Sequence, residues 1–186
     1  VIANPGELLG TETISGCMEH PLIAALFDKV EKTEIVPHVA PVPGMAPSDY
    51  VELIARRFAN PRIVDTVRRV AFDGSSRHTG FLHPIIRDGL ASGAPIAGLA
   101  LVEAIWARMC EGTREDGSTI EPNDPMWADL NTVAKAARTR PLAWLEQEHL
   151  YGDLAAAPRF VDAFEDWLRI IWHNGTDAAL EQYIGQ

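Results

Sequence analysis

Large apolar residues recur at helical spacing along most of this chain, and few segments alternate between apolar and polar residues. The strongest stripe lies near the C-terminal end, where six such residues fall on one face of a helix. They are Phe160, Phe164, Trp167, Leu168, Ile171 and Trp172. Residues 96–109 are apolar almost all round, which predicts a central buried helix. The pattern therefore predicts an all-α, multi-helical fold over residues 1–186.

Prolines and glycines divide the chain into short predicted helices. We expect a first helix over residues 6–19 and a second that begins at Pro21. Ser48 is placed to cap a later helix, because acidic residues follow it directly. Asn60 precedes a proline, an arrangement typical of a helix start, so we expect another helix there.

Two segments are predicted to be irregular. Residues 33–47 contain four prolines and one glycine. Proline at this density fixes φ and removes backbone donors, so we expect an ordered, extended strap. Residues 110–124 read as a loop, with a short hairpin around Asp116-Gly117.

Composition restricts the partners of the protein. Apolar residues make up 47% of the chain, enough for a sizeable core, and the formal net charge is −10. Such an acidic surplus argues against DNA, RNA or an anionic membrane as a partner. No apolar run approaches the roughly 18 residues of a membrane-spanning helix, and no signal peptide is recognisable. Cys17 and Cys110 are expected to be reduced thiols of a cytoplasmic protein.

Most catalytic signatures are absent. The chain has no glycine-rich dinucleotide fingerprint, no P-loop and no nucleophile elbow. His78 and His83 would lie about 140° apart on an α-helix, so we do not expect them to share a metal. Glu146 and His149 have the spacing of half a di-iron site, but no second such pair is present. We therefore expect no metal.

Glu103 stands alone in the apolar segment 96–109. It is either a buried functional carboxylate or, as we expect, an acid that is partly exposed or paired with an arginine.

The densest polar segment spans residues 65–88. Its run D-G-S-S, residues 73–76, is expected to break one helix and cap the next with a serine, which would bring Arg69 near Arg77. Arg77 would then lie at the unfavourable end of a helix dipole, and such departures point to function. Because guanidinium groups bind hydroxyl groups and carboxylates, we predict that Arg69 and Arg77 bind substrate. The alternative is that both are paired with the surplus acids.

The run ARRFANPRIVDTVRRVAFDGSSRHTGFLHPIIRDGL, residues 55–90, resembles the signature segment of the C-terminal domain of the mannitol dehydrogenase family, the long-chain polyol dehydrogenases. Three further runs are similar to the same domain: VAPVPGMAPSDYVELI, GAPIAGLALVEAIWARMCEGTREDGSTIEPNDP and YGDLAAAPRFVDAF. The resemblance thus covers nearly the whole chain. The family has an arginine before D-G-S-S, which Arg69 matches, and a lysine directly after it, where this chain has Arg77.

This resemblance implies a helical domain of an enzyme that interconverts a polyol and a ketose, or related sugar acids, with NAD or NADP and without a metal. An N-terminal Rossmann-type domain would hold the cofactor, and a K-x-x-x-x-N-x-x-H motif would supply a lysine base. Neither lies in this chain, which begins at Val1. We therefore expect a fragment that is inactive alone, whose partners are the polyol or ketose and its own nucleotide-binding domain.

Two other functions remain open from the residues themselves. The chain could be a standalone acidic helical module that binds a partner protein. It could also be a small metal-dependent helical enzyme built around Glu146 and His149.

Overall fold

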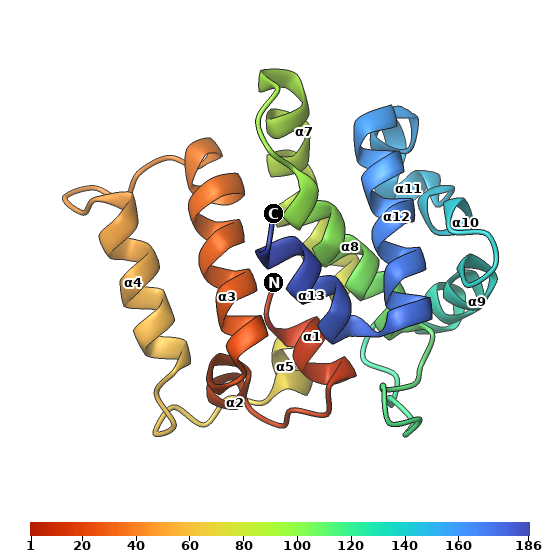
Figure 1. Cartoon of the computed structure of the whole chain (residues 1–186), viewed down its shortest axis with the longest axis horizontal. Coiled ribbons are helices and arrows are strands. Elements are labelled where there is room, and N and C mark those ends of the chain that lie inside the picture. The colour runs from red at the N-terminus through yellow and green to blue at the C-terminus, as the bar shows by residue number, and fades with distance from the viewer.

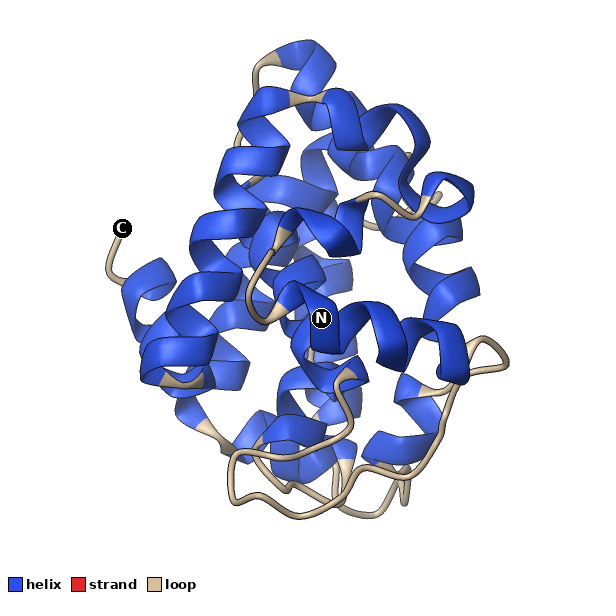
Figure 2. Cartoon of the chain, turned by 90° about the vertical axis from the view of Figure 1, so that its right-hand side faces the viewer, coloured by secondary structure: helices blue, strands red, loops and turns tan.

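The computed structural model describes residues 1–186 and contains helices without a β-sheet (Figure 2). The thirteen α-helices are α1 (Ala3–Leu8), α2 (Ile14–Glu19), α3 (Pro21–Val30), α4 (Pro47–Phe58), α5 (Val67–Ala71), α6 (Gly74–Arg77), α7 (His83–Ser92), α8 (Ala97–Cys110), α9 (Trp127–Ala137), α10 (Leu142–Leu145), α11 (Glu148–Tyr151), α12 (Pro158–Asn174) and α13 (Thr176–Ile184). Two π-helical turns (Glu31–Ile35 and His78–Leu82) and two 3₁₀ turns (Val36–His38 and Gly152–Ala156) complete the helical structure. The all-α prediction is confirmed.

Helix α8 is the centre of the domain, as its apolar sequence predicts. Every residue of α8 except Ala97 is buried, and α12, α1, α9, α13 and α3 all pack against it. Figure 1 shows α8 behind α13, with α3 and α4 on one side and α12 on the other. The stripe predicted on α12 faces this core, and Trp167 donates its indole N–H to the carbonyl of Ala97, 2.9 Å away.

The N-terminus of α8 is capped by a buried carboxylate from another element. Glu34, in the turn after α3, accepts the backbone N–H groups of Gly98 and Leu99, each at 2.8 Å. The hydroxyl of Tyr183 donates to the same carboxylate at 2.9 Å. The helix dipole and these donors together stabilise a negative charge that would otherwise be costly to bury.

The strap prediction is only partly right. Helical structure continues from α3 through His38, so the irregular stretch is confined to residues 39–46. Pro37 is compatible with this continuation because it lies in the first turn of the 3₁₀ segment, where its missing N–H has no partner to lose. After the stretch, α4 returns in the opposite direction (Figure 1), and Phe58 meets Phe27 of α3 at a ring-centroid distance of 5.9 Å.

Three other helix boundaries differ from expectation. The predicted helix over residues 6–19 is two helices, because Gly10 adopts a positive φ of 74° that ends α1. Helix α4 begins at Pro47, so Ser48 lies inside it and does not cap it. No helix begins at Asn60; its side chain accepts the backbone N–H of Arg62 and closes a turn instead. The predicted hairpin is confirmed by a bridge between Thr113 and Thr119.

Candidate functional site

The corner between α5 and α6 holds the two predicted site arginines. Asp73 is the one residue other than glycine with a positive φ, 59°, and this left-handed conformation turns the chain from α5 into α6. Gly74 follows it and lies so close to Trp106 of α8 that a Cβ at this position would stand 2.5 Å from the indole nitrogen. Asp73 and Gly74, the first two residues of the D-G-S-S run, thus allow a sharp turn and a close approach of α6 to α8.

Ser75 and Asp124 fix the start of α6. The Asp124 carboxylate accepts both the backbone N–H and the hydroxyl of Ser75, each at 2.8 Å, and the N–H of Met126 at 2.8 Å. The expected serine cap is therefore wrong, since Ser75 lies within the helix and the anchoring carboxylate comes from a distant loop. The effect is to hold Arg77, the last residue of α6, in a defined position.

Arg69 lies in α5 and is exposed to solvent. Its guanidinium donates to both carboxylate oxygens of Asp65, four residues earlier. This pairing lowers the pKa of Asp65 and raises that of Arg69. Arg69 is therefore paired with an acid, which is the alternative left open from the sequence. A guanidinium has five N–H donors, however, so further donors of Arg69 remain for a ligand.

Arg77 has no acidic partner. Its Nε donates to the backbone carbonyl of Phe72 at 2.9 Å, which leaves both terminal amino groups without a protein acceptor. Arg77 and Arg69 line one open surface hollow of about 500 Å³ together with Thr66, Arg68 and Phe72. Arg68 is committed elsewhere, because it donates to the backbone carbonyls of Glu121 and Pro122. The structure therefore brings the two predicted residues together.

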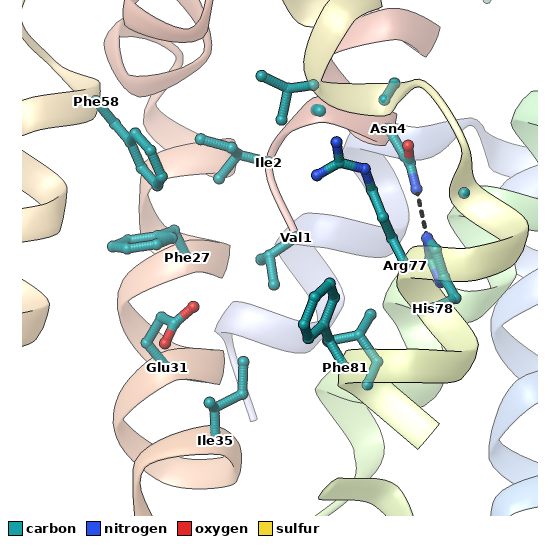
Figure 3. Close-up of a pocket in the computed structure, with 15 residues that line it drawn as sticks. Val1, Ile2, Asn4, Phe27, Glu31, Ile35, Phe58, Arg77, His78 and Phe81 are labelled. Atoms are coloured by element: carbon teal, nitrogen blue, oxygen red, sulfur yellow. Dashed lines mark hydrogen bonds between the residues drawn. The ribbon is translucent and has the colours of Figure 1, made fainter. Parts of the chain in front are cut away.

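A second cavity, of about 290 Å³, is also lined by Arg77 (Figure 3). Its walls are mostly apolar, with Phe27 and Phe58 on one side and Phe81 on the other. The polar side chains Asn4, Arg77 and His78 lie together at one wall. Because Arg77 lines both hollows, it marks the junction between an apolar space and a polar one.

Behind this wall lies a buried polar network centred on Glu103. The side chain of Glu103 is fully buried. His78 Nδ1 lies 2.7 Å from Oε1, while the Tyr151 hydroxyl donates to Oε2 at 2.8 Å. His83 Nε2 lies 3.3 Å from Oε2, within ion-pair distance but without good hydrogen-bond geometry. The expectation that Glu103 is partly exposed or paired with arginine is therefore wrong.

The two histidines share this carboxylate because the helix between them is not an α-helix. His78–Leu82 forms a π-helical turn, in which the N–H of His83 bonds to the carbonyl of His78. Bonding from residue i to residue i+5 places such residues on one face, whereas α-helical geometry separates them. The separation of about 140° expected for an α-helix therefore does not apply to His78 and His83, which both approach the Glu103 carboxylate.

Burial and hydrogen bonding shift two pKa values in the network. Burial by itself would raise the pKa of Glu103, but His78 and His83 outweigh it and hold this pKa far below its ordinary value. Burial and the neighbouring Glu103 carboxylate raise the pKa of the Tyr151 phenol well above its usual range. Glu103 is therefore an ionised acceptor, and Tyr151 is a neutral donor.

The structure does not bring the other candidate residues, Glu146 and His149, into a site. Glu146 is exposed and pairs with Arg140, which lowers the pKa of Glu146, and His149 is exposed as well. The structure contains no group of three or more histidine, cysteine, aspartate or glutamate side chains arranged for a metal. None of its helices has the length and apolar character to cross a membrane. Cys17 and Cys110 are free and buried.

Comparison with known proteins identifies the domain. The chain belongs to the family of the mannitol dehydrogenase C-terminal domain, which matches residues 1–172. It is 44% identical over 184 residues to a mannitol 2-dehydrogenase of Cereibacter sphaeroides, an alignment that covers 99% of this chain and 39% of that protein. A mannitol 2-dehydrogenase of Aspergillus clavatus is 31% identical over 98% of this chain and 37% of its own length.

A solved structure has the same fold. Pseudomonas fluorescens mannitol 2-dehydrogenase, determined as a ternary complex with NAD and D-mannitol, matches with a TM-score of 0.94 at 28% identity. The match covers 100% of this chain and 38% of that one. The chain thus spans about two-fifths of the length of these relatives.

Proposed function

We propose that this chain is the C-terminal, substrate-side domain of a longer NAD-dependent polyol dehydrogenase, which oxidises a secondary alcohol of a sugar alcohol to a ketose. The observation that carries the proposal is the match of the whole chain to a mannitol 2-dehydrogenase that was solved with NAD and D-mannitol. The 44% identity to the Cereibacter sphaeroides mannitol 2-dehydrogenase supports the same activity. These likenesses favour a dehydrogenase over a standalone protein-binding module.

In this proposal Arg69 and Arg77 hold the polyol. Both line the same open hollow, and each retains guanidinium donors that no protein group uses. Several N–H groups in fixed positions can donate hydrogen bonds to hydroxyl oxygens and hold the sugar alcohol in one orientation, which is catalysis by positioning. Asp65 contributes by fixing the Arg69 fork, and the D-G-S-S corner contributes by fixing Arg77.

The cofactor would be bound outside this chain. NAD recognition of the Rossmann type needs a strand followed by a glycine-rich turn and a helix, and this chain has neither the glycine pattern nor a β-strand. The residues present therefore do not fit a nucleotide site of their own. We propose that a preceding nucleotide-binding domain supplies the cofactor and the base, and that the enzyme works in the cytoplasm, where Cys17 and Cys110 would stay reduced.

The test is a comparison of the full-length enzyme with the isolated 186-residue chain. Each is supplied with NAD and, in turn, D-mannitol, D-arabinitol or D-sorbitol, and NADH formation is followed. The proposal predicts turnover of at least one polyol by the full-length enzyme and none by the isolated chain. Turnover by the isolated chain, or none by the full-length enzyme with NAD or NADP, would overturn it.

A further inference from the structure

Asn4 carries a polar atom that the protein leaves unused at the wall of the apolar cavity. Asn4 is 6% exposed, lies in α1 and lines this cavity beside Arg77 and His78. Its amide nitrogen lies 3.0 Å from His78 Nε2 (Figure 3). Its amide oxygen, turned away from His78 in Figure 3, accepts no hydrogen bond from the protein.

The buried network determines which way this amide points. Glu103 is an ionised acceptor, so His78 Nδ1 must carry the proton that bridges the two groups. His83 Nδ1 faces the carbonyl of Leu150 at 3.1 Å and must also be protonated, while its Nε2 faces Glu103. His83 Nε2 lacks hydrogen-bond geometry to Glu103, so the Glu103 carboxylate takes its hydrogen bonds from His78 and Tyr151.

The other ring nitrogen of His78 faces Asn4. The Asn4 amide nitrogen lies 3.0 Å from His78 Nε2, and because an amide nitrogen can only donate, Nε2 is the acceptor of this hydrogen bond. The amide nitrogen is thus committed to His78, and the oxygen is the atom that faces a ligand.

We propose that Asn4 is a substrate-binding residue whose Oδ1 accepts a hydrogen bond from a hydroxyl of the polyol that Arg77 holds. His78, fixed by Glu103, is the positioning residue that keeps the amide in this orientation. This inference rests on the proposed function and adds a specificity rule to it. A hydroxyl group can accept from Arg77 and donate to Asn4, whereas a carboxylate can only accept. The pair therefore selects an alcohol group over the carboxylate of a sugar acid.

The test uses the full-length enzyme with Asn4→Leu, which keeps the approximate volume and removes the acceptor. D-mannitol is the substrate and D-mannonate the competing ligand, replaced by D-arabinitol and D-arabinonate if that polyol is turned over faster. Loss of one neutral hydrogen bond predicts a KM for the polyol that rises roughly tenfold, with kcat and the KM for NAD within about twofold. The preference for the polyol over the aldonate should shrink by a similar factor.

Asn174→Leu is the matched control, because Asn174 is exposed at the end of α12 and lines neither hollow. It should leave all these constants unchanged. His78→Phe keeps a ring that can stack on Trp106, 4.2 Å away between centroids, but removes the acceptor for Asn4. It should reproduce the rise in KM without a fall in kcat; if it does not fold, Asn4→Leu still decides.

An unchanged polyol KM, or an unchanged polyol-to-aldonate preference, in a folded Asn4→Leu enzyme overturns the inference and leaves the proposed function standing. A wild-type enzyme that oxidises no polyol overturns the proposed function instead. The two failures are therefore distinguishable.

Discussion

Replacing Glu103 by glutamine tests whether the buried network contains a true ion pair. Glu103→Gln preserves shape but removes the charge that faces His78, His83 and Tyr151. A buried cation left without its partner destabilises a protein by about 3–5 kcal/mol. For a domain of this size each kcal/mol corresponds to a shift of about 2–4 °C in Tm, so we expect Tm to fall by about 6–20 °C.

The dependence on pH gives a second check. The pKa of Glu103 in the folded protein lies below its ordinary value of 4.5. The ion pair therefore contributes fully above that ordinary value, and its contribution is lost as the pH falls toward the folded-state pKa. The gap in Tm between the wild type and Glu103→Gln should be large at about pH 6 and smaller at about pH 3.

The assay is thermal unfolding followed by circular dichroism on both proteins at both pH values. Glu146→Gln is the matched control, because Glu146 is exposed and paired with Arg140. Exposed ion pairs contribute little, so this variant should melt close to the wild type. A Glu103→Gln protein as stable as the wild type at about pH 6, or a gap that widens in acid, would refute the reasoning.

Two further substitutions test the corner that positions Arg77. Gly74→Ala should destabilise the domain by about 1–3 kcal/mol, because the added methyl group overlaps the Trp106 indole. The free energy of unfolding is measured by urea titration. Gly80→Ala is the control and should not destabilise the domain, because no neighbour lies within 4 Å of its Cβ. Equal losses of stability in the two variants would contradict the packing argument. Asp124→Ala should lower the free energy of unfolding by about 2–4 kcal/mol, because it leaves the N–H and hydroxyl of Ser75 without an acceptor. A loss near zero would show that Asp124 does not anchor α6.

The elements predicted best from sequence are those whose burial is complete or strictly one-sided. Helix α8 is apolar almost all round, which is typical of a fully buried helix, and α12 is apolar on one face, which gives a clear period of 3.6. Helix boundaries were harder, because proline and serine allow several local conformations. Pro37 is compatible with continued helical structure and Ser48 with a position inside a helix, and tertiary packing decides between these alternatives.

The proximity of Arg69 and Arg77 was predictable from sequence, but the network behind them was not. Arg69 and Arg77 lie near each other in sequence, and one short corner brings them to the same hollow. Glu103 meets partners 25 and 48 residues away in sequence, which no local pattern shows. The sequence holds one hint of the π-helical turn that aligns His78 with His83, because their five-residue spacing is the i to i+5 period of such a turn. This spacing alone does not distinguish a π-helical turn from an α-helix.

The most direct test of the central claim is the effect of Arg69→Ala and Arg77→Ala on the full-length enzyme. The KM for the polyol and the dissociation constant for NAD are measured on both variants, with Arg77→Lys as the charge-preserving control. If these residues grip the sugar alcohol, the polyol KM rises at least about tenfold in each alanine variant, NAD binding stays unchanged, and lysine restores part of the loss. Equal losses of polyol and NAD binding, or no change in polyol KM, would contradict the assignment of this domain as the substrate-holding part of the enzyme.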